Sequence, residues 1–234
     1  MKDSAVADGN APEGAVKFYK RDFWIDENRK HIPAHYRLKK SARIINSLAG
    51  RKECDLLDVG CGPATLMGLL PENIHYYGID LAIHAPAPNL IESDIAENPI
   101  RFGDKTFDII VALGLFEYVG DRQSRKFSEI AELLNEHGIF IVTYTNFDHR
   151  HRQVFDAFNN VQPFEDFRRD LSRYFVVDRC FPASHNWSGG QPTRKLVKFA
   201  NAYVSRNVPV VSPRLAVEYF LICSPLGSRP HAGL

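Results

Sequence analysis

Five short apolar runs, each ended by turn residues, are the feature of this sequence that most restricts its fold. They are DLLDVG, HYYGID, NLIESD, FDIIVALG and GIFIVTYT, all between residues 54 and 145. Four of them are apolar at consecutive positions, which is typical of strands that are covered on both faces. A helical pattern over 121–138, ended by Gly138, separates the last two runs. Strands that alternate with helices predict a parallel α/β sheet.

Two connections in this region are short. LAIHAPAP, with two prolines, joins Asp80 to Asn89, whereas a parallel crossover takes about a dozen residues or more. We therefore expect its helix to be vestigial or missing. After the first run, Pro63 is placed to open a short helix. Beyond Thr145 we expect, in order, a helix, a strand, a helix and a final strand, with the sequences FEDFRRDLSRY, YFVVDRCF, RKLVKFANAYVSR and VEYFLICS.

The length of 234 residues allows one large domain or two small ones. We predict a disordered N-terminus over 1–14, where residues are small and polar, followed by a single domain over 15–234. Within it, 15–53 is a helical cap and 54–145 is the core. The remainder, 146–234, carries further helices and the closing strands.

Composition and charge restrict the partners and the compartment. Lys and Arg total 29 against 28 for Asp and Glu, whereas proteins that bind nucleic acid usually carry a basic excess. The N-terminus has no apolar signal segment, and the longest apolar stretch, Ile109 to Val119, is too short for a bilayer. The four cysteines form no CxxC pair or metal-ligand cluster. We expect a soluble cytoplasmic protein with free thiols, no metal site and no membrane partner.

The first apolar run leads into a glycine loop, LLDVGCGPAT. Gly60 and Gly62 let the backbone approach a ligand closely, and a helix N-terminus offers free amides to a negative group. A dinucleotide motif GxGxxG would need glycine at Thr65, so that interpretation is disfavoured. Asp58, two residues before the loop, suits a ligand with a cationic amine or sulfonium.

Two further runs also end in carboxylates. Asp80 stands twenty residues after Gly60, the spacing at which an acid accepts hydrogen bonds from ribose hydroxyls. Asp94 ends the third run and suits an exocyclic adenine amine. Each aspartate by itself is equally compatible with a helix cap or a turn. Because ligands of open α/β sheets bind at the carboxyl ends of strands, three such acids in succession indicate a ligand site.

With these motifs the chain resembles the class I S-adenosylmethionine-dependent methyltransferases, in their bacterial small-molecule and MetW-like group. The matching segments are LLDVGCGPATL, YYGIDLA, SDIAENP, FDIIVALGLFEYV and LLNEHGIFIVTY. The resemblance implies a Rossmann-like class I methyltransferase fold, with a mostly parallel seven-stranded sheet and an antiparallel last strand, VEYFLICSPL. Ala64 departs from the family, which most often has a third glycine there.

The resemblance also implies a set of residues for S-adenosylmethionine. Arg37, Asp58 and the amides around the glycine loop would hold the methionine end, Asp80 the ribose, and Asp94 with Ile95 the adenine, while the end of the fourth strand would lie near the sulfonium. The full set is Arg37, Asp58, Gly60, Cys61, Gly62, Asp80, Leu81, Asp94, Ile95, Ala112 and Leu113.

For the reaction we expect methyl transfer to a hydroxyl or amine of a small molecule. Tyr144 and His149 follow or end the fifth strand and are the candidate general bases, whereas Glu117 is expected to fix its loop structurally. Four residues are candidates for acceptor binding, namely Tyr19, Trp24, His185 and Trp187.

Three alternatives stay open. The first is a non-catalytic binding or regulatory protein that keeps the fold, and the second is a nicotinamide-dependent oxidoreductase, disfavoured by Asp58 and Thr65. The third is a nucleic-acid methyltransferase, disfavoured because ALGLFEY stands where such enzymes place a [DNS]-P-P-[YFW] segment. The sequence leaves the acceptor and the oligomeric state undetermined.

Overall fold

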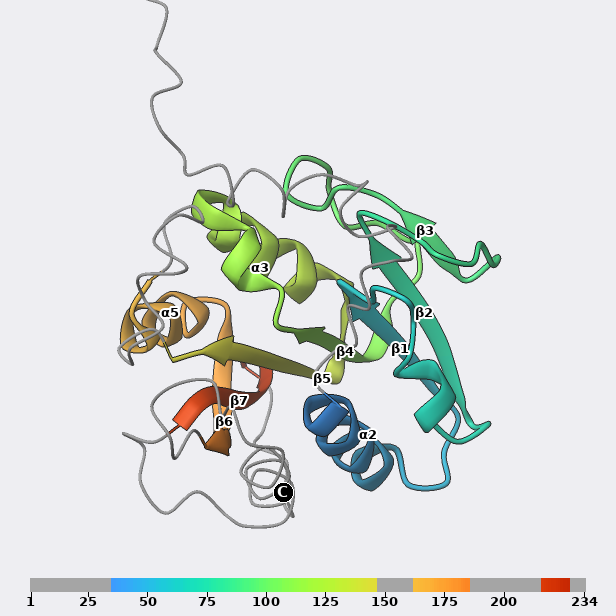
Figure 1. Cartoon of the computed structure of the whole chain (residues 1–234), viewed down its shortest axis with the longest axis horizontal. Coiled ribbons are helices and arrows are strands. Elements are labelled where there is room, and N and C mark those ends of the chain that lie inside the picture. Colours follow the sequence, from blue (N-terminus) through green and yellow to red (C-terminus); the bar gives the residue numbers. More distant parts are fainter. Residues whose placement is uncertain (1–34, 147–161, 186–215, 228–234) are drawn as a thin grey trace, which may run out of the picture.

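The computed structural model describes residues 35–146, 162–185 and 216–227. These form a seven-stranded sheet in the order β3-β2-β1-β4-β5-β7-β6 (Figure 1). Strands β1 to β5 pair in parallel, and in the described sheet β7 runs antiparallel to both of its neighbours. The predicted α/β fold with its antiparallel last strand is confirmed. In chain order the strands are β1 (Cys54–Val59), β2 (Ile74–Asp80), β3 (Leu90–Glu92), β4 (Phe107–Leu113), β5 (Leu134–Thr145), β6 (Phe175–His185) and β7 (Ala216–Pro225).

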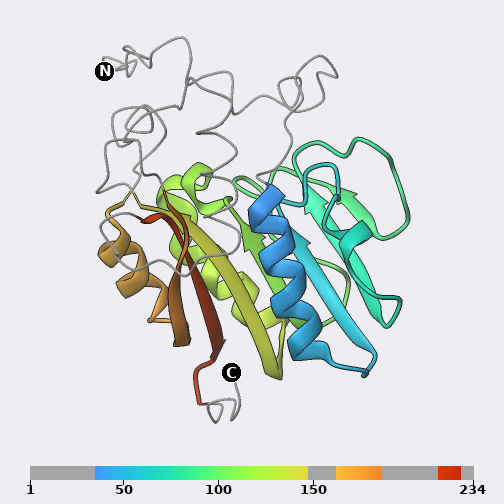
Figure 2. The ribbon, with the colours of Figure 1, turned by 60° about the horizontal axis from the view of Figure 1, so that its bottom comes forward.

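Helices cover both faces of the sheet (Figure 2). Helix α2 (His35–Ala49) packs on one face, and α3 (Gln123–Leu133) and α5 (Phe164–Leu171) pack on the other. Leu56 and Leu57 show why the strands are apolar at consecutive positions. Both side chains are fully buried, but Leu56 belongs to the core under α2 and Leu57 to the core under α3 and α5.

The first three strands are joined by almost no helix. One 3-10 turn, η2 (Met67–Leu69), lies between β1 and β2, and no helix lies between β2 and β3, as predicted for LAIHAPAP. The prediction of a helix that begins at Pro63 is wrong. Ala64 has φ +53°, a left-handed conformation that a right-handed helix does not accept, so the chain turns there and the helical turn is delayed to η2.

The end of the helix predicted over 121–138 also differs. Two 3-10 turns, η3 (Phe116–Tyr118) and η4 (Gly120–Arg122), precede α3, and α3 ends at Leu133. Gly138 lies inside β5, because β4 draws this segment into the sheet. Phe107 pairs with Leu134 and Ile109 pairs with Ile139, so the residues between 134 and 139 form an irregularity in the ladder.

The later elements follow the expected order where they are described. The predicted helix and strand after residue 162 correspond to α5 and β6, and the final strand corresponds to β7. The predicted N-terminus (1–14), residues 15–34 of the cap and the helix over RKLVKFANAYVSR lie outside the described residues, whereas the rest of the cap holds α2. No helix in the described ranges is long and apolar enough to cross a membrane. The same residues hold no His, Cys, Asp or Glu cluster suited to a metal, and their four cysteines are unpaired.

Candidate functional site

The glycine loop follows β1 and packs tightly between the ends of β2 and β4. Gly60 has φ +80°, and a Cβ there would lie 2.8 Å from Leu115 Cδ1. Its amide donates a hydrogen bond to the carbonyl of Ile79 on β2, at 2.8 Å. A side chain at position 60 would therefore strain the backbone and would have to displace the Leu115 side chain. This explains why the loop needs glycine where the chain leaves the strand.

Asp80, at the end of β2, holds the glycine loop in place. Its Oδ2 accepts a hydrogen bond from the amide of Gly62 at 2.8 Å, and its Oδ1 accepts one from the amide of Ala82 at 3.1 Å. Burial raises the pKa of Asp80, while the amides of Gly62, Ala82 and Leu81 act against that rise. The carboxylate predicted to bind ribose is thus fixed at the meeting point of two strand ends.

Asp58, on β1, is buried beside these groups and has a partner that the sequence analysis missed. Tyr76 donates its hydroxyl to Asp58 Oδ2 at 2.8 Å, and both side chains are almost inaccessible, at 6% and 3% exposure. Burial raises the pKa of Asp58 to about 7. The Tyr76 hydrogen bond opposes the rise and the charge of Asp80 adds to it. Burial and the charges of both aspartates also raise the pKa of the nearby Cys61 thiol.

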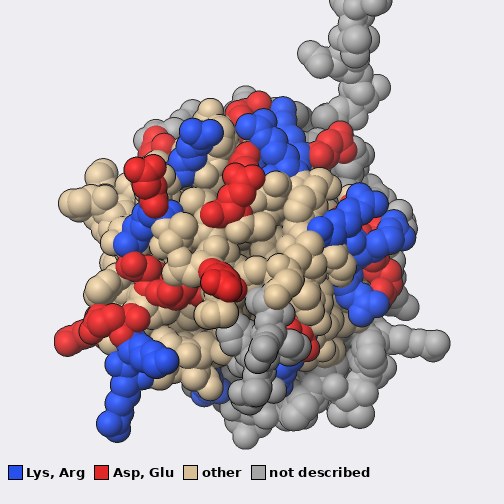
Figure 3. Space-filling model, turned by 180° about the vertical axis from the view of Figure 1, so that it is seen from behind, with Lys and Arg blue, Asp and Glu red and all other residues tan. Residues whose placement is uncertain are grey.

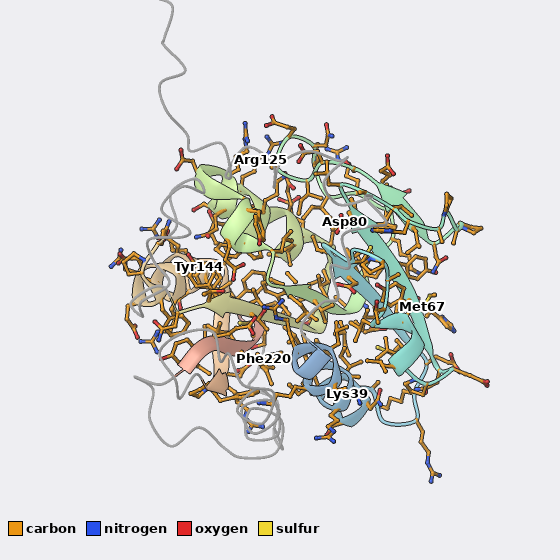
Figure 4. All side chains as sticks on the ribbon, in the orientation of Figure 1. Lys39, Met67, Asp80, Arg125, Tyr144 and Phe220 are labelled. Carbon is orange, nitrogen blue, oxygen red and sulfur yellow. The ribbon has the colours of Figure 1, made fainter. Side chains whose placement is uncertain are left out.

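Asp94 lies in the turn after β3, close to Asp80. The amide of Ser93 donates to the backbone carbonyl of Asp80 at 2.7 Å, so the turn begins beside Asp80. Asp94 Oδ1 accepts from the amide of Ala96 at 2.9 Å, and Ile95 is buried in the core. The structure therefore brings Asp58, Asp80 and Asp94 to one edge of the sheet, as the spacing predicted. Figure 4 shows Asp80 at this edge.

The end of β4 completes this edge, and an arginine of α2 lies over it. Ala112 is fully buried, Leu113 is partly buried, and Gly114 has φ +69°. A Cβ on Gly114 would lie 2.5 Å from Arg37 Nη1, so the missing side chain makes room for the guanidinium. Arg37, predicted to contact the methionine carboxylate, thus lies over the strand end where the sulfonium was expected.

Arg37 belongs to a buried charge cluster. Its Nε lies 2.6 Å from Glu218 Oε1 on β7, and the Glu218 side chain is 1% exposed. Glu117 of η3 accepts two hydrogen bonds from Thr145 through one oxygen, from the amide at 2.9 Å and from the hydroxyl at 2.7 Å. Burial raises the pKa of Glu117, and the positive charge of Arg37 acts against it. As expected, Glu117 fixes its loop. Glu218 was missed, although an isolated acid in an apolar strand was a visible signal.

Tyr144, a candidate base, lies in the core on the α5 face. Its side chain is 1% exposed, and its ring stacks on Phe167 with a centroid distance of 3.8 Å. The hydroxyl exchanges two 3.0 Å hydrogen bonds with the backbone of Gln162. Figure 4 shows Tyr144 well apart from Asp80, as follows from the strand order, in which β2 and β5 are three strand spacings or about 14 Å apart. This placement supports a structural role.

The other predicted residues of the acceptor side are not placed by the structure. His185 ends β6, but its side chain is outside the described part, and the remaining candidates fall outside the described residues altogether. These are Tyr19, Trp24, His149 and Trp187. The cofactor residues of the prediction are therefore brought together, whereas the catalytic and acceptor-binding assignments stay predictions.

Comparisons with known proteins agree with this geometry. A family model described as a methyltransferase domain matches residues 33–178, and none of the curated proteins gives a significant match. A chain from the complex of the Haloferax volcanii Trm112 methyltransferase activator superposes with a TM-score of 0.62 at 14% identity, covering 88% of this chain and 97% of that one.

Two further solved structures share the fold. An S-adenosylmethionine-dependent methyltransferase from Clostridium acetobutylicum has a TM-score of 0.55 at 13% identity, over 82% of this chain and 91% of that one. The N-methyltransferase NodS from Bradyrhizobium japonicum has a TM-score of 0.52 at 11% identity, over 81% and 96%. At these identities the likeness concerns the fold.

Proposed function

Because this chain belongs to the methyltransferase-domain family, we propose that it transfers a methyl group from S-adenosylmethionine to a hydroxyl or amine of a small molecule. Its cofactor is S-adenosylmethionine. The observation that carries the proposal is the placement of Asp58, Asp80 and Asp94 at the carboxyl ends of three neighbouring strands, with Asp80 fixing the glycine loop at 2.8 Å. Ligands of open α/β sheets bind at this edge.

Each part of the site has a chemical task in this reaction. The loop amides and Asp58 would face the methionine end of the cofactor, Asp80 the ribose, and the Asp94 turn the adenine. Arg37, held by Glu218 above Gly114, would face the methionine carboxylate. Methyl transfer from a sulfonium is an in-line displacement, so the protein acts mainly by aligning the acceptor with the methyl group and excluding water.

A small acceptor is favoured over a nucleic acid by the distribution of charge. The net charge is +1. On the face seen in Figure 3, acidic and basic side chains are interspersed and form no continuous basic surface. On α5, Arg168 pairs with Glu165 and Arg169 with Asp166. Phosphate binding would call for unbalanced basic groups.

The acceptor side is proposed to come from the flanks at 15–53 and 146–234, in a single domain over 15–234. Tyr19, Trp24, His185 and Trp187 would line it, and His149 would act as the general base. Tyr144 is the weaker candidate for the base because its hydroxyl already bonds to Gln162. The unpaired cysteines support a reducing compartment, the cytoplasm.

Calorimetric titration of the purified protein with S-adenosylhomocysteine tests the cofactor. A folded protein that does not bind it would refute the proposal. Transfer of labelled methyl groups from S-adenosylmethionine to a panel of small hydroxyl and amine compounds tests the acceptor class. Binding without any transfer would favour the second candidate, a binding protein that keeps the fold. The engagement of Tyr144 in the core is the observation that favours this alternative.

A further inference from the structure

The turn that carries Asp94 has no helix of its own to support it. Residues 81–89, before β3, and residues 93–106, after it, are all described, and neither segment contains a helix. β3 itself is a three-residue edge strand, Leu90–Glu92. In a doubly wound sheet, helices in these connections would pack beside the strand ends. Here the position of the turn must be set by contacts from another element.

Helix α3 supplies those contacts through a buried lysine and its neighbour one turn later. Lys126 Nζ donates to the carbonyl of Asn98 at 2.8 Å, and Glu129 Oε2 accepts from the amide of Ile100 at 3.1 Å. The two side chains also pair with each other, Nζ to Oε2, at 2.7 Å. The Lys126 side chain is 1% exposed. The Lys126–Glu129 ion pair of α3 is therefore hydrogen-bonded both to the Asn98 carbonyl and to the Ile100 amide, in the backbone that follows Asp94.

The contacts continue from Asn98 to Asp94 itself. The amide of Asn98 donates to the carbonyl of Asp94 at 2.8 Å, so the residue held by Lys126 closes the turn that begins at Asp94. Ile95 and Ile100, on either side of Asn98, are buried in the same core as Phe127 of α3. The turn is therefore fixed to α3 by apolar contacts and by the buried ion pair.

The hydrogen bonds around Glu129 favour the charged form of its carboxyl group. Burial alone would raise the pKa of Glu129, but the hydrogen bonds from Lys126, the Ile100 amide and Arg125 outweigh it, and the pKa is lowered. A buried ion pair adds little net stability compared with apolar residues of the same volume. Its directional bonds do, however, restrict the backbone to one position.

We propose that Lys126 and Glu129 are positioning residues that hold the Asp94 turn in register with the adenine of the cofactor. They thereby set the preference for a 6-amino purine over a 6-oxo purine. This inference rests on the proposed function. Asp94 can accept a hydrogen bond from the 6-amino group only if its carboxylate stays in place. A 6-oxo group would instead place a second acceptor oxygen opposite the carboxylate, with no donor between them. Lys126 touches neither cofactor nor acceptor and acts through the turn.

The test compares the binding of S-adenosylhomocysteine with that of S-inosylhomocysteine, by calorimetry, in the wild type, Lys126→Met and Arg125→Met. Arg125 is the matched control. Its side chain is 57% exposed, and its Nε lies 2.9 Å from the other Glu129 carboxylate oxygen, Oε1. Figure 4 labels Arg125. The wild type and Arg125→Met should prefer the adenine compound by about 10-fold or more, as for a lost hydrogen bond to a charged group. In Lys126→Met the preference should fall to about 3-fold or less.

Each other outcome is informative. A Lys126→Met protein that keeps its preference, even with a lower unfolding temperature, would overturn the positioning role and leave a structural one. A wild type that binds both compounds equally would remove Asp94 from adenine recognition and overturn the inference, while the proposed function would stand. A wild type that binds neither compound would refute both proposals together.

If Lys126→Met does not fold, Glu129→Gln and hydrogen exchange of the wild type replace it. Glu129→Gln keeps the size of the side chain and weakens the contact to the Ile100 amide. It should reduce the preference in the same direction. In the wild type, S-adenosylhomocysteine should slow exchange at the Ala96, Asn98 and Ile100 amides more than S-inosylhomocysteine does. Equal protection by the two compounds would contradict the inference.

Discussion

The buried hydrogen bond from Tyr76 to Asp58 allows a quantitative prediction for Tyr76→Phe. This substitution removes the hydroxyl that donates to Asp58 Oδ2 at 2.8 Å and leaves the ring in place. Because the pKa of Asp58 is about 7, its carboxyl is ionised at pH 8.5 and protonated at pH 5.5. The same substitution therefore removes a bond to a charged group at high pH and to a neutral group at low pH.

The expected cost differs between the two pH values. A hydrogen bond to a charged group contributes about 1.5–3 kcal/mol and one between neutral groups about 0.5–1.5 kcal/mol. Tyr76→Phe should therefore lower the free energy of unfolding by about 2 kcal/mol at pH 8.5 and about 1 kcal/mol at pH 5.5. The difference of about 1 kcal/mol corresponds to a further rise of about 0.7 in the pKa of Asp58.

The sign of the pH dependence follows from the direction of the shift. The folded protein holds the Asp58 proton more tightly than the unfolded chain, where the ordinary pKa is 3.8. As the pH rises from about 4 to about 7, the unfolded chain ionises first, so this group lowers the free energy of unfolding. Above pH 7 the decrease is complete. In Tyr76→Phe it should continue to nearly pH 8.

Urea denaturation followed by circular dichroism at pH 5.5, 7.0 and 8.5 provides the measurement. Tyr77→Phe is the matched control. The Tyr77 ring packs against the core under α3 and α5, on the other face of the sheet from Tyr76, with its centroid 5.6 Å from that of Phe107. Tyr77→Phe should lower the free energy of unfolding by the same amount at pH 5.5 and at pH 8.5, because Tyr77 does not bond to Asp58. A Tyr76→Phe cost that is equal at pH 5.5 and 8.5 would show that Asp58 does not titrate between them and would refute the reasoning.

Three further predictions concern other parts of the site. Asp80→Ala should weaken binding of S-adenosylhomocysteine by about 10-fold or more, measured by calorimetry, because it loses the ribose partner and the Gly62 contact; an unchanged affinity would remove Asp80 from the site. Gly114→Ala should lower the free energy of unfolding by about 1–2 kcal/mol, since φ is +69° and the new Cβ would meet Arg37; a melting temperature equal to that of the wild type would contradict this. Tyr144→Phe should lower the free energy of unfolding by about 1–2 kcal/mol and leave cofactor affinity unchanged, because it loses its bonds to Gln162. A stable Tyr144→Phe protein with methyl transfer reduced about 100-fold or more would instead identify Tyr144 as the base.

Sequence patterns predict those parts of the fold that depend on neighbouring residues in the chain. The two-sided burial of Leu56 and Leu57 produces the consecutive apolar residues from which the parallel strands were predicted. Positive φ at the glycine loop can be anticipated from Gly60. The same reasoning failed at Pro63, because Ala64 after it adopts a left-handed conformation that alanine rarely adopts and that its residue type therefore does not signal.

Groups that meet across the fold could not be predicted in the same way. The sequence marks Tyr76 only as a strand residue. The parallel register brings it to Asp58, because Leu56 lies beside Tyr76 and Asp58 beside Gly78. Likewise, Arg37 and Glu218 come from opposite ends of the chain and meet only because β7 inserts between β5 and β6. The burial of Lys126 under the Asp94 turn depends on connections that lack helices.

By itself, the sequence determined the class of sheet, the glycine loop and the edge at which three carboxylates gather. These follow from residue periodicity and from the rule that parallel strands end on one side. Only the tertiary structure decided which partners hold those carboxylates: Tyr76 for Asp58, the Gly62 amide for Asp80, and the α3 ion pair for the Asp94 turn. The reason is that hydrogen bonds require contact within about 3 Å, and register and packing between remote segments set such distances.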